Sequence, residues 1–216
     1  MMLSLPNSMS RALRATALTA VLAIAGTPGA NADVRPGEAA PDFKLVDTSG
    51  QTVSLASLKG KVVVLEWTNH ECPYVRKHYG TDTMQTLQRD ATGQGVVWLT
   101  VISSAPGTQG NVSSAEADKL TAERKAAPSH VVFDSEGDVG RLYKATATPH
   151  MYVIDKDGKL AYAGAIDDKP SADRATINGA RPYAREAITA VLAGTPVAVT
   201  TTRAYGCTIK YAPARS

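Results

Sequence analysis

The chain has 216 residues, of which 44% are hydrophobic and 20% are charged. These values are typical of a globular protein and exclude a disordered or collagen-like chain, and the length suits one domain with short appendages. Basic residues outnumber acidic ones by only 23 to 20, and two of the arginines lie in the first 32 residues. Because the remainder is nearly neutral and has no basic cluster, nothing in the charge pattern predicts nucleic-acid binding.

Residues 1–32 have the pattern of a cleavable secretory signal peptide. Arg11 and Arg14 precede an apolar stretch over residues 15–26, and small residues end the segment at Ala32. The apolar stretch is shorter than the roughly 20 residues that a membrane-spanning helix needs. We therefore expect cleavage near Ala32, a periplasmic or secreted protein and no stable membrane anchor, with an uncleaved anchor as the less favoured alternative.

The elements expected after the signal peptide follow from residue patterns in chain order. A hairpin over residues 43–55 turns at Ser49-Gly50, and Asp157-Gly158 marks a second tight turn. The remaining expected strands are residues 61–67, 95–103, 130–134, 151–155 and 159–166. The expected helices are residues 73–89, 115–127, 137–145 and 181–194.

Strands that alternate with helices and end in an antiparallel hairpin predict an α/β fold with a mixed central sheet and helices on both of its faces. Residues 61–67 are β-branched without alternation, which indicates a strand buried on both faces. We expect the domain to span residues 33–194, and the tail over residues 195–216 shows no periodicity.

Cys72 is the first candidate for chemistry. It follows a buried strand, and Pro73 is favourable in the first turn of a helix. The unpaired N–H groups at a helix N-terminus stabilise a thiolate and lower the thiol pKa, which makes such a cysteine a nucleophile. A buried structural cysteine is the alternative.

A second signal lies at Thr148-Pro149, where a proline directly precedes a strand. Strand, Cys72-Pro73 turn, helix, Thr148-Pro149 and the hairpin at Asp157-Gly158 follow one another in an order that resembles the thioredoxin-like redoxins. The match is to the peroxiredoxin-like (AhpC/TSA-type) branch in particular, and it includes the entry segment "GEAAPDFKLVDTSGQTVSLASLKGKVVVLEW" and the tail motif "GCTIK".

The resemblance implies a thioredoxin fold and assigns roles to particular residues. Cys72 corresponds to the reactive cysteine, Thr148 and Pro149 to the active-site cis-proline loop, and His150 to a neighbour that lines the same pocket. Two positions depart from the family. Val75 replaces the second cysteine of a C-x-x-C pair, and Asn69 stands where peroxidases have threonine or serine, so that the peroxide pocket of Asn69, Pro73 and His150 is unusual.

Cys207, about 135 residues downstream of Cys72, is the candidate resolving cysteine. If the tail folds back, a peroxide would oxidise Cys72 to a sulfenic acid, Cys207 would condense with it, and a thiol reductant would reset the pair. The expected substrate is a peroxide or a protein disulfide. Two alternatives stay open: a permanent Cys72–Cys207 bridge in a non-enzymatic binding module, and two cysteines that never meet.

A metal site is the third interpretation of this region. His70, Cys72, His78 and His150 are ligand types that bind copper or zinc, as in a copper chaperone. Val75 removes the nearby cysteine that a thioredoxin-like metal carrier generally keeps. We therefore predict an enzyme with no metal and no cofactor.

Overall fold

A seven-stranded mixed sheet forms the centre of the molecule, with the strand order β2-β1-β5-β4-β3-β7-β8. Its central strands β3, β4 and β5 are parallel, and the flanking pairs are antiparallel. The strands are β1 (Lys44–Asp47), β2 (Thr52–Ser54), β3 (Val63–Trp67), β4 (Val97–Ile102), β5 (His130–Phe133), β7 (His150–Ile154) and β8 (Leu160–Gly164). The predicted α/β class and mixed sheet are confirmed.

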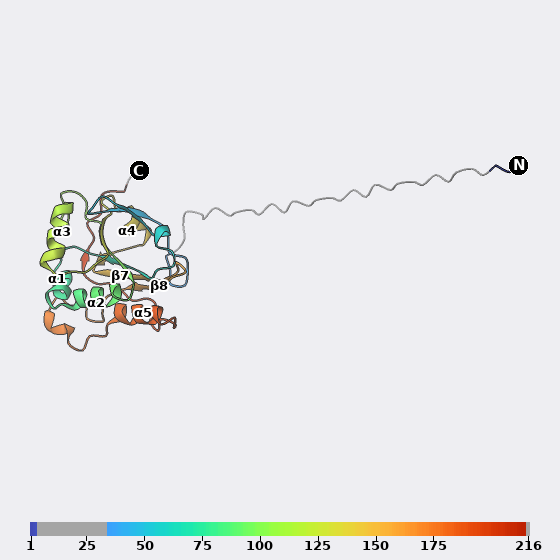
Figure 1. The fold of residues 1–216 in the computed structure, drawn as a ribbon. Helices are drawn as coiled ribbons and strands as arrows, with labels where there is room; N and C mark the ends of the chain where they lie inside the picture. Colours follow the sequence, from blue (N-terminus) through green and yellow to red (C-terminus); the bar gives the residue numbers. More distant parts are fainter. Residues whose placement is uncertain (4–33, 215–216) are drawn as a thin grey trace. The chain divides into compact units, whose positions relative to one another are not determined.

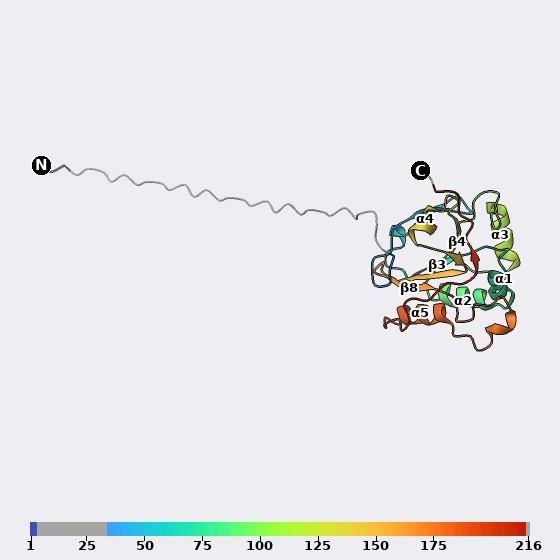
Figure 2. The same ribbon diagram turned by 180° about the vertical axis from the view of Figure 1, so that it is seen from behind.

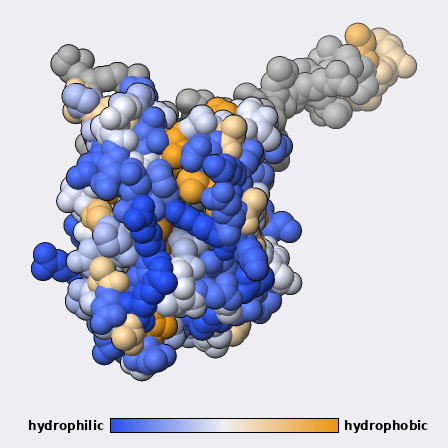
Figure 3. Space-filling model, turned by 90° about the vertical axis from the view of Figure 1, so that its left-hand side faces the viewer, coloured by the Kyte–Doolittle hydropathy of each residue, from blue (hydrophilic) through white to orange (hydrophobic). Residues whose placement is uncertain are grey.

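Helices cover both faces of this sheet, as Figures 1 and 2 show. The α-helices are α1 (Pro73–Gly80), α2 (Thr83–Thr92), α3 (Ser114–Glu123), α4 (Asp138–Leu142) and α5 (Tyr183–Leu192), and two short 3-10 helices are η1 (Ala56–Leu58) and η2 (Arg174–Ile177). Helices α1, α2 and α5 lie on one side of β7 and β8, and α4 lies on the other. On the side of α1 and α3, the surface is mainly hydrophilic (Figure 3).

The computed structural model describes residues 1–3 and 34–214. The signal peptide predicted for residues 1–32 therefore lies, beyond its first three residues, outside the described part of the chain. Among the helices that are described, none has both the length and the apolar character of a membrane span.

The sheet separates two hydrophobic clusters. On one face, Leu65 and Trp67 of β3 pack with Tyr143 beside α4. On the other face, Val64 packs with residues of α2 and α5, among them Met84. All five residues of β3 are buried, which explains why its sequence, apart from Glu66, is apolar without alternation.

Two predicted helices differ most from the structure. Residues 73–89 form two helices, because Asp82 adopts a left-handed conformation with φ of 57° and the Thr81 hydroxyl donates to the carbonyl of Lys77 at 2.8 Å, closing α1. The helix predicted over 115–127 ends at Glu123, because Lys125 also has a positive φ of 53°.

The tail returns to the sheet after α5. The amide of Ala163 donates to Thr200, and that of Thr202 to Ala163, at 3.0 and 3.1 Å. The chain then forms the short strand β9 (Cys207–Thr208), which pairs with β6 (Ala147–Thr148). No periodicity in the tail sequence predicted these contacts.

Candidate active site

Cys72 lies at the N-cap of α1, with Pro73 as the first helical residue. Its extended backbone conformation, with φ of −67° and ψ of 124°, turns the chain from the loop after β3 into the helix. The amide of Cys72 closes this turn on the carbonyl of Asn69 at 3.1 Å. The Cys72 side chain has no exposed surface, so the residue is at once a helix-start cysteine and a buried one.

The loop that faces Cys72 contains the Thr148–Pro149 peptide bond, which is cis. Proline is the residue for which a cis bond is accessible, because its tertiary amide weakens the trans preference. The Cys72 thiol donates to the carbonyl oxygen of Thr148 at an S–O distance of 3.1 Å. The loop and the helix N-terminus therefore meet at the sulfur.

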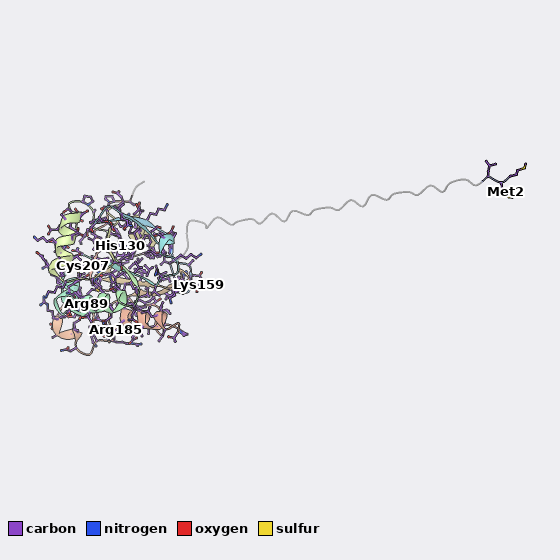
Figure 4. The ribbon with its side chains drawn as sticks, in the orientation of Figure 1. Met2, Arg89, His130, Lys159, Arg185 and Cys207 are labelled. Atoms are coloured by element: carbon purple, nitrogen blue, oxygen red, sulfur yellow. The ribbon has the colours of Figure 1, made fainter. Side chains whose placement is uncertain are left out.

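Cys207 completes this group from the tail. Residues Thr148 and Cys207 are opposite one another in the antiparallel pair β6–β9, and Cys207 packs against the buried cluster that contains Cys72. Both are free thiols, Cys72 buried and Cys207 partly exposed. In Figure 4, Cys207 lies on the side of the molecule where α1 and α3 are found.

The electrostatics of the two thiols differ. Burial raises the pKa of Cys72, but hydrogen bonds with the side chains of Cys207 and Thr148 and the backbone amides of Val75 and Cys207 outweigh burial and hold that pKa below its ordinary value. For Cys207, burial together with the neighbouring Cys72 raises the pKa to about 12. Of the two thiols, Cys72 is therefore the more acidic, and Cys207 stays protonated at neutral pH.

Asn69 and His150, which were also predicted to line the pocket, are both buried and hydrogen-bonded. Asn69 is buried, and its amide side chain accepts from the Glu71 amide at 2.9 Å and donates to Gln109 at 3.3 Å. His150 is hydrogen-bonded through Nδ1 to the amide of Thr146 at 3.3 Å. Burial lowers the pKa of His150 to about 4, so its ring is neutral at physiological pH.

His150 also contributes to a groove of about 1030 Å³ beside the tail. Its lining includes Tyr74, Thr146, His150, Asp167, Tyr205 and Gly206. Cys72 is not among the residues that line this groove.

Metal ligation is the other chemistry that the histidines suggested. Within the part of the chain that the structure describes, no three His, Cys, Asp or Glu side chains converge as a metal-binding group. His70 lies near Arg76 and Arg124, both of which donate to its carbonyl oxygen, at 3.2 and 3.1 Å.

Two features of the site region were missed at the level of sequence. Glu66 on β3 is fully buried and accepts from the side chains of Tyr79, Gln88, Trp98 and Thr100 at 2.9 to 3.3 Å. Burial raises the pKa of this carboxyl. In the sequence, a lone acidic residue inside an apolar strand could have indicated this site. The second missed feature is Tyr205, which fixes the tail through buried polar groups. No pattern in the sequence indicated it.

The fold and the paired thiols beside a cis-proline define a thioredoxin-like redoxin, a thiol-dependent oxidoreductase in the general sense. Residues 36–163 match the AhpC/TSA family, and the chain belongs to that family. The predicted resemblance and thioredoxin fold are confirmed. A search among curated proteins found no match.

Several solved structures are similar over most of the chain. An uncharacterized conserved protein from Geobacillus kaustophilus has a TM-score of 0.70 and 26% identity, over 84% of this chain and 95% of that one. A hypothetical protein from Sinorhizobium meliloti 1021 has a TM-score of 0.69 and 22% identity, over 84% and 97%. A candidate thiol:disulfide interchange protein, DsbE, from Chlorobium tepidum has a TM-score of 0.53 and 26% identity, over 74% and 99%.

Proposed function

We propose that this protein is a thiol peroxidase in which Cys72 is the nucleophile and Cys207 the resolving thiol. The observation that supports it most directly is the pairing of Cys207 with Thr148, since Thr148 also accepts from Cys72. One residue thus brings together two sulfurs that are distant in sequence. Pro149 shapes the loop that holds Thr148, and Pro73 starts the helix that favours the Cys72 thiolate.

The two thiols of the protein and an external thiol reductant supply all the electrons that the reaction needs. The Cys72 thiolate attacks one peroxide oxygen, an S–O bond forms, the O–O bond breaks, and the departing oxygen takes a proton as water or an alcohol. The sulfur of Cys207 then attacks the sulfenic sulfur of Cys72, an S–S bond forms, and the hydroxyl group leaves with the Cys207 proton as water. Two thiols of a reductant return the disulfide to Cys72 and Cys207 by exchange.

The two pKa shifts support this order of events. The pKa of Cys72 is held below its ordinary value before oxidation, which raises the fraction of thiolate, and the thiolate is the nucleophilic form. Part of the raised pKa of Cys207 comes from Cys72 itself. The share of that contribution that depends on the Cys72 charge disappears when a Cys72 thiolate becomes a neutral sulfenic acid, which favours the Cys207 thiolate at the step that needs it.

A small oxidant is favoured over a protein disulfide because the Cys72 side chain has no exposed surface. Disulfide exchange is the second candidate. The Chlorobium tepidum structure, a candidate thiol:disulfide interchange protein, supports it at 26% identity. Val75 stands where a C-x-x-C motif would have its second cysteine, so exchange here would also use Cys207.

Peroxide consumption by the reduced protein tests the proposal. We expect hydrogen peroxide to be consumed stoichiometrically with loss of both thiols, and mass spectrometry to find a Cys72–Cys207 disulfide. Cys72→Ser should abolish consumption, whereas Cys207→Ser should still react but form no disulfide, leaving Cys72 as an oxidised acid. Reaction at the rate of free cysteine would refute the peroxidase. Rapid thiol exchange with a disulfide-containing protein in that case would favour the second candidate.

Reduction of the oxidised protein from this experiment separates an enzyme from a binding module with a permanent bridge. A catalytic disulfide must be reduced in every cycle, and strained or exposed disulfides are the more easily reduced ones. We expect mild dithiol treatment of the oxidised protein to restore both thiols and the peroxide reaction. A Cys72–Cys207 bridge that resists this treatment would support the module.

We further propose that the protein acts outside the cytoplasm, in the periplasm or after secretion. The sequence pattern of residues 1–32 supports this. N-terminal sequencing of protein recovered from the periplasm or the medium should find Asp33 as the first residue. Retention of residues 1–32 on the recovered protein would contradict cleavage.

A further inference from the structure

The tail segment that contains Cys207 is short and fixed at both ends. We call residues 203–208 the lid. Before the lid, the Thr202 hydroxyl accepts from the amide of Ala165 at 2.8 Å. After it, Ile209 is buried, and the Tyr211 hydroxyl donates to the carbonyl of Ala145 at 2.8 Å. A segment fixed at both ends can arch outward only in its middle.

Tyr205 holds the middle of the lid to the body of the protein. Its hydroxyl donates to the carboxylate of Asp167 and lies 3.2 Å from Nε2 of His78. Its ring lies 5.7 Å from the Lys77 ammonium and meets the ring of Tyr74 edge-on at 5.8 Å. His78 and Lys77 belong to α1, the helix that Cys72 begins.

The polar groups around Tyr205 are themselves buried. Lys77, His78 and Asp167 are 1%, 0% and 5% exposed, and Lys77 lies 3.7 Å from Asp167. Because Tyr205 uses its proton for Asp167, His78 must donate from Nε2. This tautomer fits the neutral ring expected from burial, which lowers the pKa of His78 to about 4. Loss of the Tyr205 hydroxyl would therefore leave a buried carboxylate and a buried N–H each without one partner.

Gly206 lets the lid approach the cis-proline loop. Its φ of 138° lies in a region that favours glycine. A Cβ atom at this position would collide with the carbonyl group of Thr148. Thr148 is the partner of both cysteines, so this close contact lets the lid bring Cys207 to the same residue that Cys72 contacts.

We propose that Tyr205 is a positioning residue that keeps the lid closed, holding Cys207 against Cys72 and shielding Cys72 from large reagents. The sulfurs stay in contact while the Tyr205 hydroxyl is bound to Asp167 and His78, and Cys72 becomes accessible to macromolecules when these bonds break. The protein then resolves its own oxidised cysteine faster than another protein can reach it. This proposal rests on Cys72 as the reactive thiol and Cys207 as its partner.

Alkylation of the reduced protein tests the lid without any peroxide chemistry. Wild type, Tyr205→Phe and the control Tyr183→Phe, which removes a tyrosine hydroxyl on α5 outside the lid, are each treated with iodoacetamide and with a maleimide-linked polyethylene glycol. Modification of the Cys72 peptide is followed by mass spectrometry. We expect Tyr205→Phe to raise the rate with the polymer about tenfold, the order expected from hydrogen bonds to charged groups, and to change the iodoacetamide rate less. Tyr183→Phe should match wild type.

Gly206→Ala is an independent variant that should also raise the rate with the polymer. Its added methyl group pushes the lid away from Thr148, whereas Tyr205→Phe removes the hydrogen bond to Asp167. Equal polymer rates in wild type, Tyr205→Phe and Gly206→Ala would overturn the proposal. A dimedone-trapping experiment adds the second readout: after peroxide treatment, the Cys72 sulfenic acid should persist longer in Tyr205→Phe. If peroxide never oxidises Cys72, the peroxidase proposal fails, while the alkylation rates still decide the role of the lid.

Discussion

Cys207 lies opposite Thr148 in antiparallel register, and this pairing is made by the backbones of the two-residue strands β6 and β9. Backbone pairing does not depend on the side chain at position 207. Substitutions of Cys207 should therefore leave the tail in place, and they can be used to separate what the sulfur does from what the strand does.

Replacement of Cys207 should change the acidity of Cys72. The Cys207 side chain makes the largest contribution among those that lower the pKa of Cys72 against burial. We expect Cys207→Ala to raise this pKa, and Cys207→Ser, which keeps a hydrogen-bond donor, to raise it less. The measurement is the pH dependence of iodoacetamide alkylation at the Cys72 peptide. The same midpoint in Cys207→Ala and wild type would show that the Thr148 side chain and the backbone amides lower the pKa without help from the Cys207 side chain.

Glu66→Gln should destabilise the protein although it removes a buried ionisable group. Four side chains surround the carboxylate as donors, and an amide would direct its own N–H groups at one or more of them. A buried polar group that loses its partner costs about 1–3 kcal/mol, so we expect a loss of that size in the free energy of unfolding from urea titration. Glu123→Gln, at an exposed site on α3 with a 3.9 Å ion pair to Lys119, is the control and should change stability by less than about 1 kcal/mol. Equal stability of Glu66→Gln and wild type would mean that the four surrounding side chains reorient around the amide without a loss of free energy.

Elements whose signals are local could be predicted from the sequence. The apolar run of β3 and the turn at Asp157-Gly158 both depend on neighbouring residues, and both occur in the structure. The break at Asp82 could not be predicted, because residues on both sides of it have helical spacing and the left-handed conformation of one aspartate ends the helix.

The candidate site was only partly predictable for a related reason. Cys72 and the Thr148-Pro149 loop could be identified by their order and by family resemblance. The position of Cys207 depends on the two-residue pair β6–β9, and a pair this short has no sequence period. Its location is determined by long-range contacts, such as that of Tyr205 with Asp167, which no local pattern encodes.

Asp47 should make the free energy of unfolding depend on pH in the acidic range. A side-chain hydrogen bond from Ser49, assisted by His130 at 2.9 Å and by backbone amides, lowers the pKa of Asp47 to about 2. A carboxyl group whose folded pKa is depressed stabilises the fold above its unfolded pKa, near 3.9, and loses this effect as the pH falls through its folded pKa.

We therefore expect Asp47→Asn to lower the free energy of unfolding at pH 7 by about 1–2 kcal/mol, the order of the hydrogen bonds lost. The difference from wild type should shrink between about pH 4 and pH 2. Urea titrations across this range measure it, with the exposed Asp118→Asn as control. If the difference in the free energy of unfolding stays constant down to pH 2, the Asp47 side chain stabilises the fold through its packing and not through its charge.

A local resolving cysteine should replace the distant one. Val75 is fully buried in the first turn of α1, three residues after Cys72, where a second thiol would face the helix start. In a Cys207→Ser background, peroxide should drive Cys72 to sulfinic and sulfonic acids, because no thiol condenses with the sulfenic acid. Adding Val75→Cys should divert the sulfenic acid to a disulfide between Cys72 and the thiol introduced at position 75, at a stability cost of about 1 kcal/mol for the lost methyl group.

Mass spectrometry distinguishes the two outcomes, since the disulfide loses two hydrogens and the over-oxidised protein gains oxygen. Val75→Ser in the same background is the matched control and should over-oxidise like Cys207→Ser alone. If the Val75→Cys protein also over-oxidises, the thiol at position 75 does not reach Cys72 from the first turn. The long connection through β9 would then be the route by which this fold brings a second sulfur to its nucleophile.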